Sequence, residues 1–432
     1  MRGTFGLAAA TVAAFVTGSL ARPLVVQPGG VDDIVITEHN TLNSTSKVEA
    51  AEGNNPLQIE IVNNFGENQM FLYVTGQDSN GVACLVDADG NLFYPDAGGS
   101  AVPVLIEGNI KSELGGLGST TTFTVPEFLI SSRIWVSEGE LQFFTSLDPD
   151  SGRTNIVEPS VANPKDPSAG IKWGFVEFNW ANGEIYANIT YVDWVGIAMG
   201  MSLTLGTGEV QTVKGLVAGG VQKLCDDLNA QNAEDSAGWD KLCMTNDNGE
   251  AVRVLSPNLY LDLDPSWQAE YYNGYIDEVW SKYANEDLTI NTQSNASNVA
   301  CRVADDQLTC AGDNRGYPKP TIGDIYGCNT GPFAIIDGDN GVHRAVVPRL
   351  CAAFHRSTLL LDGGNVQPSL PAENYYTANP TSHYSRIVHV YEEDNIGYAF
   401  SYDDINPEGE NASGTVAGPD PTLLRVTVGG WS

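Results

Sequence analysis

The chain has 432 residues, with 54 acidic side chains against 21 Lys and Arg, so its formal net charge is −33. This length corresponds to about two to three domains, and a hydrophobic content of 42% is typical of a globular protein. The charge disfavours nucleic acid and anionic membrane surfaces as partners, because binding to polyanions depends on Lys and Arg. A neutral ligand is compatible with this composition.

The first 21 residues have the features of a secretory signal peptide. Arg2 precedes an apolar, Ala-rich stretch over 5–16, and residues 19–21 provide a small-x-small cleavage site. The apolar stretch is too short to span a membrane. We therefore expect a secreted protein, extracellular or associated with a cell wall, in which residues 22–55 form a pro-segment or a loose, disordered arm.

The cysteines fit an oxidising export route. Six of the seven lie between 225 and 351, which allows three disulfides, and we predict pairing of nearest neighbours: 225–243, 301–310 and 328–351. Cys84 has apolar neighbours and is predicted to be a buried free thiol. No cysteine pair has zinc-site spacing and the chain has only five His, so we expect neither a metal nor a cofactor. Four glycosylation sequons also fit this route, at Asn43, Asn188, Asn295 and Asn411.

Residues 57–205 are predicted to be strands. Short runs with a two-residue period recur there, rich in Val, Ile, Phe, Tyr and Thr and separated by Gly, Asn and Asp; examples are 58–63, 70–74 and 132–136. Several such runs in succession are typical of an antiparallel sandwich or barrel.

The pattern changes after residue 205. Apolar residues at helical spacing predict a helix over 214–232. Asp264 followed by Pro265 predicts the start of a second helix, which continues through 267–283. A third helix is predicted over 342–355, with Pro348 inside it.

Strands are predicted again from Ser385 onward, at 386–390, 398–400 and 423–428. The order of these elements predicts a mainly β protein, in which an α/β domain interrupts a β-domain. The β-domain covers 56–205 and 376–432, and the inserted domain covers 206–375. We expect the ligand in a cleft between the two domains.

The densest set of polar and aromatic residues surrounds a predicted hairpin turn at Asn182-Gly183. Glu177 and Asp193 flank this turn within otherwise apolar and aromatic runs. Two carboxylates suit glycoside hydrolysis, in which a protonated acid serves the leaving oxygen and the other carboxylate acts as base or nucleophile. The alternative is that both are ordinary surface carboxylates on a half-buried sheet.

A regular hairpin does not bring these two carboxylates together. A two-residue turn pairs Glu177 with Asn188, which leaves Asp193 about five residues further along, or roughly 16 Å at ~3.3 Å per residue. An inverting pair stands ~6.5–9.5 Å apart and a retaining pair closer still. A catalytic role therefore requires a bulge, a strand break or a sharp coil near 190–193.

From about residue 57 to 430, the chain resembles the glycoside hydrolase family 64 β-1,3-glucanases, of the laminaripentaose-producing type. The matching motifs occur in order at 157–160, 163–167, 176–178, 188–190, 192–196, 349–359, 383–387 and 398–404. The resemblance implies a thaumatin-like β-domain and an inverting, endo-type hydrolase. Its implied substrate is a linear β-1,3-glucan of the laminarin or curdlan type, which it cuts into short oligosaccharides.

The resemblance also implies roles for individual residues. Glu177 corresponds to the general acid and Asp193 to the general base that activates water. Asn179, Tyr186 and Thr190 fall at positions where the family contacts sugar.

Three further residues are weaker candidates. Asp403 follows an aromatic run and either lines the same acidic cleft, as a substrate-binding residue, or forms a turn. His355 and His383 either contact the substrate or are structural. Two functions stay open: a hydrolase, and a non-catalytic thaumatin-like β-glucan-binding protein. The intact carboxylate pair favours the hydrolase, and we expect it to be a monomer.

Overall fold

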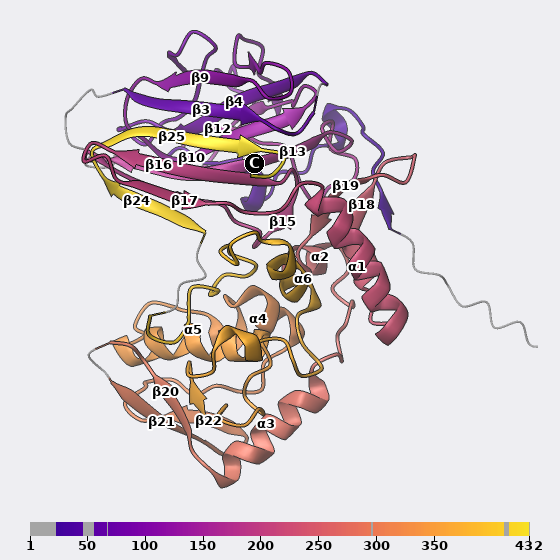
Figure 1. Cartoon of the computed structure of the whole chain (residues 1–432), viewed down its shortest axis with the longest axis vertical. Helices are drawn as coiled ribbons and strands as arrows, with labels where there is room; N and C mark the ends of the chain where they lie inside the picture. The colour runs from indigo at the N-terminus through magenta and orange to yellow at the C-terminus, as the bar shows by residue number, and fades with distance from the viewer. Residues whose placement is uncertain (1–22, 46–55, 67, 295–296, 410–413, 432) are drawn as a thin grey trace, which may run out of the picture.

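The computed structural model of the chain describes residues 23–45, 56–66, 68–294, 297–409 and 414–431. The predicted signal peptide and the sequons at Asn295 and Asn411 lie outside the described residues. Figure 1 shows stacked strands in the upper half of the molecule and helices with a small sheet in the lower half. The chain is mainly β, as the sequence predicts.

Two large sheets pack against each other and enclose the main hydrophobic core. The first has the strand order β17 (Val210–Val213), β16 (Met199–Leu205), β25 (Pro421–Val428), β3 (Leu57–Asn63) and β9 (Thr120–Val125). The second has the order β24 (Thr415–Pro419), β14 (Glu184–Asn188), β13 (Lys172–Ala181), β10 (Leu129–Glu138), β4 (Met70–Gln77), β5 (Ala83–Val86) and β6 (Leu92–Phe93), and β8 (Ser112–Glu113) also pairs with β4. In β3 the two-residue period buries Leu57, Ile59 and Ile61 on the inner face.

The described part of the N-terminal arm, 23–45, is not loose. Its strand β1 (Leu24–Val25) joins a small sheet with β18 (Cys243–Thr245), β19 (Ala251–Leu255) and β15 (Trp194–Val195). Its strand β2 (Thr41–Leu42) joins another with β12 (Thr154–Val157), β11 (Phe144–Leu147) and β7 (Val104–Leu105). Both pairings lie far apart in sequence, so the local pattern of the arm does not reveal them.

The helices lie mostly in the lower half of Figure 1. They are α1 (Gly220–Asp235), α2 (Pro257–Leu263), α3 (Asn273–Asn285), α4 (Ile322–Gly327), α5 (Gly341–His355) and α6 (His383–Tyr391). The predicted first and third helices correspond to α1 and α5, and Pro348 lies inside α5. The small lower sheet has the order β22 (Gln307–Cys310), β21 (Asn298–Ala304), β20 (Leu288–Asn291) and β23 (Val366–Gln367). None of the helices in the described part of the chain has the length and apolar character to cross a membrane.

Three predicted elements are wrong. Asp264 does not begin a helix but ends α2. That helix starts about two turns earlier, at Pro257, because Ser256 accepts a hydrogen bond from Leu259 N and Pro257 follows it. Residues 386–390 are not a strand but part of α6, which Ser382 caps through Ser385 N. The predicted strand at 398–400 is a bend, with one bridge between Tyr398 and Thr190.

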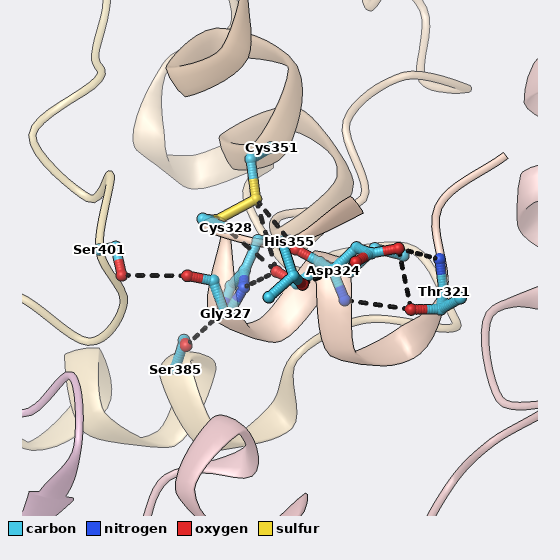
Figure 2. The surroundings of a disulfide bond; sticks show 10 residues. Thr321, Asp324, Gly327, Cys328, Cys351, His355, Ser385 and Ser401 are labelled. Carbon is cyan, nitrogen blue, oxygen red and sulfur yellow. Dashed lines mark hydrogen bonds between the residues drawn. A yellow bond between two sulfur atoms is a disulfide. The ribbon is translucent and has the colours of Figure 1, made fainter. Parts of the chain in front are cut away.

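The three predicted disulfides are present, and Cys84 is buried and free. Figure 2 shows how the Cys328–Cys351 bond joins the end of α4 to α5 beside His355. The His355 ring lies 3.3 Å from the carbonyl oxygen of Ile325 and 2.7 Å from Ser385 Oγ, so the same site connects α4, α5 and α6. His355 is therefore structural, and burial lowers its pKa to about 4.

Candidate active site

The hairpin that carries Glu177 forms as predicted. Asn182 and Gly183 have φ of 55° and 78°, the left-handed conformations that a tight two-residue turn requires. Strands β13 and β14 then pair Glu177 with Asn188 and place the Glu177 side chain on a half-buried face, 35% exposed.

The strand break required near residue 190 is also present. Strand β14 ends at Asn188, residues 192 and 193 form a bend, and β15 begins at Trp194 in a different sheet. The carbonyl oxygen of Asp193 accepts a hydrogen bond from Ser256 N at 2.8 Å, which ties this bend to the start of α2. Asp193 thus leaves the plane of the hairpin instead of continuing along it.

Arg133 lies directly opposite Glu177, on β10. Its Nε and Nη2 donate to Glu177 Oε1 at 3.3 and 3.2 Å, and its Nη1 donates to Oε2 of the buried Glu158. Thr75 Oγ1 donates to the other oxygen of Glu158 at 2.8 Å. Burial opposes the charge of the guanidinium, but the carboxylates of Glu158 and Glu177 outweigh it and raise the pKa of Arg133. One cation therefore stays between two carboxylates.

The two oxygens of Glu177 differ in their surroundings. Both bonds from Arg133 go to Oε1, and no other side chain or backbone group among the described residues donates to Oε2. The carboxylate of Asp193 likewise receives no hydrogen bond within the described part of the chain. Each side chain thus has an oxygen available to a ligand or to water, which is what an acid and base pair requires.

Two adjoining cavities contain these carboxylates. Glu177, Asn179 and Asn188 line a cavity of about 260 Å³, and Asp193 lines a second cavity of about 240 Å³. Arg133 lines both, so Glu177 and Asp193 face spaces that meet at one arginine. No group of three or more His, Cys, Asp or Glu in the described ranges is arranged to hold a metal ion.

Aromatic side chains form the floor of the Asp193 cavity. The ring centroids of Trp173 and Trp194 lie 4.3 Å apart, and those of Trp135 and Phe175 lie 4.9 Å apart. The guanidinium of Arg133 lies over the Phe175 ring at 4.5 Å. Trp135, Trp173 and Trp194 are buried, so this packing fixes the position of the arginine and makes this side of the cavity apolar.

A loop over 159–167 forms another side of the Asp193 cavity. The buried Arg253 donates to the carbonyl oxygens of Val161 and Ala169, at 3.3 and 2.7 Å. Asp166 accepts hydrogen bonds from the backbone N–H groups of Ser160 and Ser168. The polar residues of this loop therefore serve to hold its shape, and they place its backbone beside Asp193.

The predicted sugar-contacting residues lie in different surroundings. Asn179 is exposed, lines the Glu177 cavity and accepts a hydrogen bond from Ser131 N at 2.7 Å. Tyr186 pairs with it across the hairpin, and its side chain is 42% exposed. Thr190 is half-buried at the bridge to Tyr398 and lines neither cavity.

The prediction that Asp403 contacts the substrate is wrong. The residue is 1% exposed, and its carboxylate accepts hydrogen bonds from Arg356 at 2.8 Å and from His389 at 2.9 Å. Burial alone would raise the pKa of Asp403, but these two cations outweigh it and lower the pKa to about 2. Asp403 is a buried counter-ion. His383 is also largely buried, and its ring hydrogen bonds to Asn379 and Arg386.

Sequence reasoning missed Arg133, Glu158 and Asn188. Asn188 lines the Glu177 cavity, and its buried Oδ1 has no hydrogen-bond partner among the residues that the structure describes. A single arginine inside the apolar run 132–136 was the available signal for Arg133, since a cation on a half-buried strand needs a counter-charge. Glu158 lies in the motif 157–160, which is one of those that carry the family resemblance.

Comparisons with known proteins identify the family of this chain. The model of glycoside hydrolase family 64, described as beta-1,3-glucanase, matches residues 55–428. The glucan endo-1,3-beta-glucosidase of Arthrobacter sp. (strain YCWD3) is 28% identical over 356 residues, which cover 81% of this chain and 61% of that relative, less than two thirds of its length.

Solved structures show the same fold. The crystal structure of a laminaripentaose-producing beta-1,3-glucanase in complex with laminaritetraose has a TM-score of 0.74 at 26% identity, covering 88% of this chain and 99% of that one. A beta-1,3-glucanase domain from Clostridium beijerinckii has a TM-score of 0.66 at 21% identity, covering 89% of this chain and 100% of that one.

Proposed function

Since this chain belongs to glycoside hydrolase family 64, the β-1,3-glucanases, we propose that it hydrolyses linear β-1,3-glucan to short oligosaccharides with inversion at the anomeric carbon. One observation carries the proposal: Glu177 and Asp193 line adjoining cavities that meet at Arg133, and each has a carboxyl oxygen free of protein hydrogen bonds among the described residues. The relative whose structure holds laminaritetraose supports the choice of substrate.

In the proposed reaction Glu177 is the general acid. Arg133 holds Oε1, and a proton on Oε2 passes to the glycosidic oxygen as the bond from that oxygen to the anomeric carbon breaks. Asp193 is the general base. It takes a proton from a water molecule whose oxygen forms the new bond to the anomeric carbon from the opposite face of the ring. No residue becomes covalently attached to the sugar.

The surrounding residues bind and orient the glucan in this proposal. Asn179 and Tyr186, both exposed on the β13–β14 hairpin, contact sugar units on the Glu177 side. The aromatic side chains that line the Asp193 cavity hold Arg133 in position. Thr190 acts differently, since it lies at the strand break and its Oγ1 accepts a hydrogen bond from Val192 N at 3.2 Å; it positions the bend that carries Asp193.

We further propose that the protein is secreted and acts as a monomer, with a thaumatin-like β-domain. The signal-peptide features of residues 1–21 support export. Three disulfides in the lower and middle parts of the fold also support an oxidising compartment.

Product analysis tests the proposal. The protein is incubated with a linear β-1,3-glucan, and the anomeric protons of the products are followed by NMR from the first minutes. Short oligosaccharides released first as the α-anomer are the expected result. Release as the β-anomer would mean retention and a different role for Asp193. Binding of the polymer without any products would make the chain a glucan-binding protein and refute hydrolysis.

A further inference from the structure

The N-terminal arm, residues 23–45, borders both cavities of the candidate active site. Val35, Thr37 and Asn40 line the Asp193 cavity, and Glu38, Thr41 and Leu42 line the Glu177 cavity. His39 lines both. The family model begins at residue 55, so these contacts come from a segment that precedes the matched residues.

Both ends of this bordering segment are anchored in the fold. On one side, Val26 N donates to Thr245 O at 2.9 Å and Gln27 N donates to Pro164 O at 2.8 Å. On the other side, β2 pairs with β12, and Glu158 N donates to Asn40 O at 2.8 Å. Residues 35–42 are therefore held in place by backbone hydrogen bonds on both sides, as a fixed part of the cavity lining.

A buried asparagine gives the segment its shape. Asn40 is 3% exposed; its Oδ1 accepts hydrogen bonds from Thr37 N at 2.7 Å and Thr37 Oγ1 at 2.8 Å, and its Nδ2 donates to Val35 O at 3.0 Å. These bonds fold 35–40 into a tight turn. The turn holds His39 at the place where the two cavities meet.

His39 also reaches the opposite side of the Asp193 cavity. Its Nε2 lies 3.7 Å from Asp262 Oδ2, on α2, and Asp262 lines the same cavity. The side chains of both residues are substantially exposed, at 43% and 61%. They are therefore accessible to a ligand, and a sugar hydroxyl is a suitable partner for an imidazole nitrogen or a carboxylate oxygen.

We propose that the cavity-lining residues of this segment, Val35 and 37–42, form one wall of the groove that binds the glucan, and that His39 contacts the sugar units next to the bond that is cleaved. This inference rests on the proposed function, because it locates the groove from the positions of Glu177 and Asp193. A segment outside the matched family region then helps to determine which glucan chains fit and how they lie.

Protection of engineered cysteines tests this wall. The six other cysteines between 225 and 351 are in disulfides and Cys84 is buried, so a cysteine placed on the exposed arm is the reactive thiol. His39→Cys is compared with Ile36→Cys, a matched control because Ile36 is 46% exposed and lines neither cavity. Both are made in a Glu177→Gln background, so that the probe, laminarihexaose, is not consumed.

The expected result is position-specific protection. With laminarihexaose at ten times its dissociation constant, labelling at position 39 should slow by about tenfold, because only the free protein reacts. Labelling at position 36 should not change. Val35→Cys, at another exposed position that lines the Asp193 cavity, repeats the test independently of His39. Equal labelling with and without the oligosaccharide at 35, 36 and 39 would overturn the proposal.

Product analysis of the wild-type protein separates the two hypotheses. Protection at position 39 without any hydrolysis products would refute the proposed function and support the wall. Products from the wild type without protection at 35 or 39 would support the function and refute the wall.

Discussion

Replacing Glu177 with Gln tests the assignment of the general acid. Gln has nearly the same shape, and its amide oxygen can accept the two hydrogen bonds that Arg133 donates to Oε1, at 3.2 and 3.3 Å. The variant lacks the ionisable proton that Oε2, the oxygen not bonded to Arg133, would carry. The structure thus predicts a large effect on catalysis and a small effect on folding.

The expected loss of turnover is much larger than the expected loss of folding stability, so the two effects can be measured separately. Loss of a general acid lowers turnover by about 10²–10⁴-fold, which corresponds to roughly 3–5 kcal/mol in the activation free energy. The Glu177 side chain is 35% exposed, so the ion pair it gives up contributes about 1 kcal/mol or less to the free energy of unfolding. Arg133 also keeps its buried partner Glu158.

The assay compares two substrates. The kcat of the wild type and of Glu177→Gln is measured on laminarihexaose and on a β-laminarioligosaccharide with a dinitrophenyl leaving group. An activated leaving group needs no proton, so we expect the variant to lose most of its activity on the first substrate and much less on the second. Glu184→Gln, at an exposed position of the same hairpin, serves as the control and should match the wild type.

Two outcomes would contradict the assignment of Glu177 as the general acid. If Glu177→Gln lost the same factor on both substrates, the residue would not be donating a proton to the leaving oxygen. If it kept turnover near that of the wild type on laminarihexaose, Glu177 would have no catalytic role. Urea unfolding of each variant excludes misfolding as the cause of lost activity.

Three further predictions follow from the same structure. Asp193→Asn should lower kcat by about 10²–10⁴-fold on both substrates, because water must be activated whatever the leaving group; recovery on the activated substrate would argue against a base. Asp403→Asn should lower the free energy of unfolding by about 3–5 kcal/mol at neutral pH. Since the folded-state pKa of Asp403 is about 2, below the unfolded value of ~3.9, the difference from the wild type should narrow as pH falls from about 4 to 2, and a pH-independent difference in urea unfolding would refute this account. Replacing Cys328 and Cys351 together by Ala should cost about 3 kcal/mol in urea unfolding without reductant, for a sequence separation of 23; an unchanged midpoint would contradict it.

Much of the fold is readable from local patterns. The two-residue period of 57–63 forms β3, the dipeptide Asn182-Gly183 forms the hairpin turn, and the disulfides join nearest neighbours in sequence. In each of these cases the decisive interaction is local or is repeated along a strand. The prediction therefore did not depend on knowing which distant segments meet.

The wrong strand at 386–390 has a local cause. Residues 386–390 alternate enough in apolar character to suggest a strand, but Ser382 caps a helix there, and Ile387 and Val388 are buried on one face with His383 and Tyr384. Helical spacing and alternation overlap in so short a run. The N-cap at Ser382 favours the helix over the strand here.

The carboxylate pair illustrates a different limit. Glu177 and Asp193 were identifiable from sequence, but Arg133 and Glu158 were not connected to them, because pairing of β10 with β13 spans 44 residues. The prediction for Asp403 was wrong because its partners are also distant in sequence. Its position after an aromatic run suggested that it lines the cleft, whereas the fold supplies Arg356 and His389 as buried partners.

The position of Asp193 depends on segments that are distant in sequence. Beyond β14, Ile189 N donates to Gly414 O at 2.9 Å and Tyr191 N donates to Tyr398 O at 2.7 Å, while Ser256 N donates to Asp193 O at 2.8 Å. These bonds satisfy the backbone where it leaves the sheet, which is what makes a break there stable. The spacing of the two carboxylates could show that a break was required, but only the partners at 256, 398 and 414 explain why it forms. In this fold the proposed acid is positioned by the pairing of β10, β13 and β14, and the proposed base by backbone hydrogen bonds to residues 256, 398 and 414.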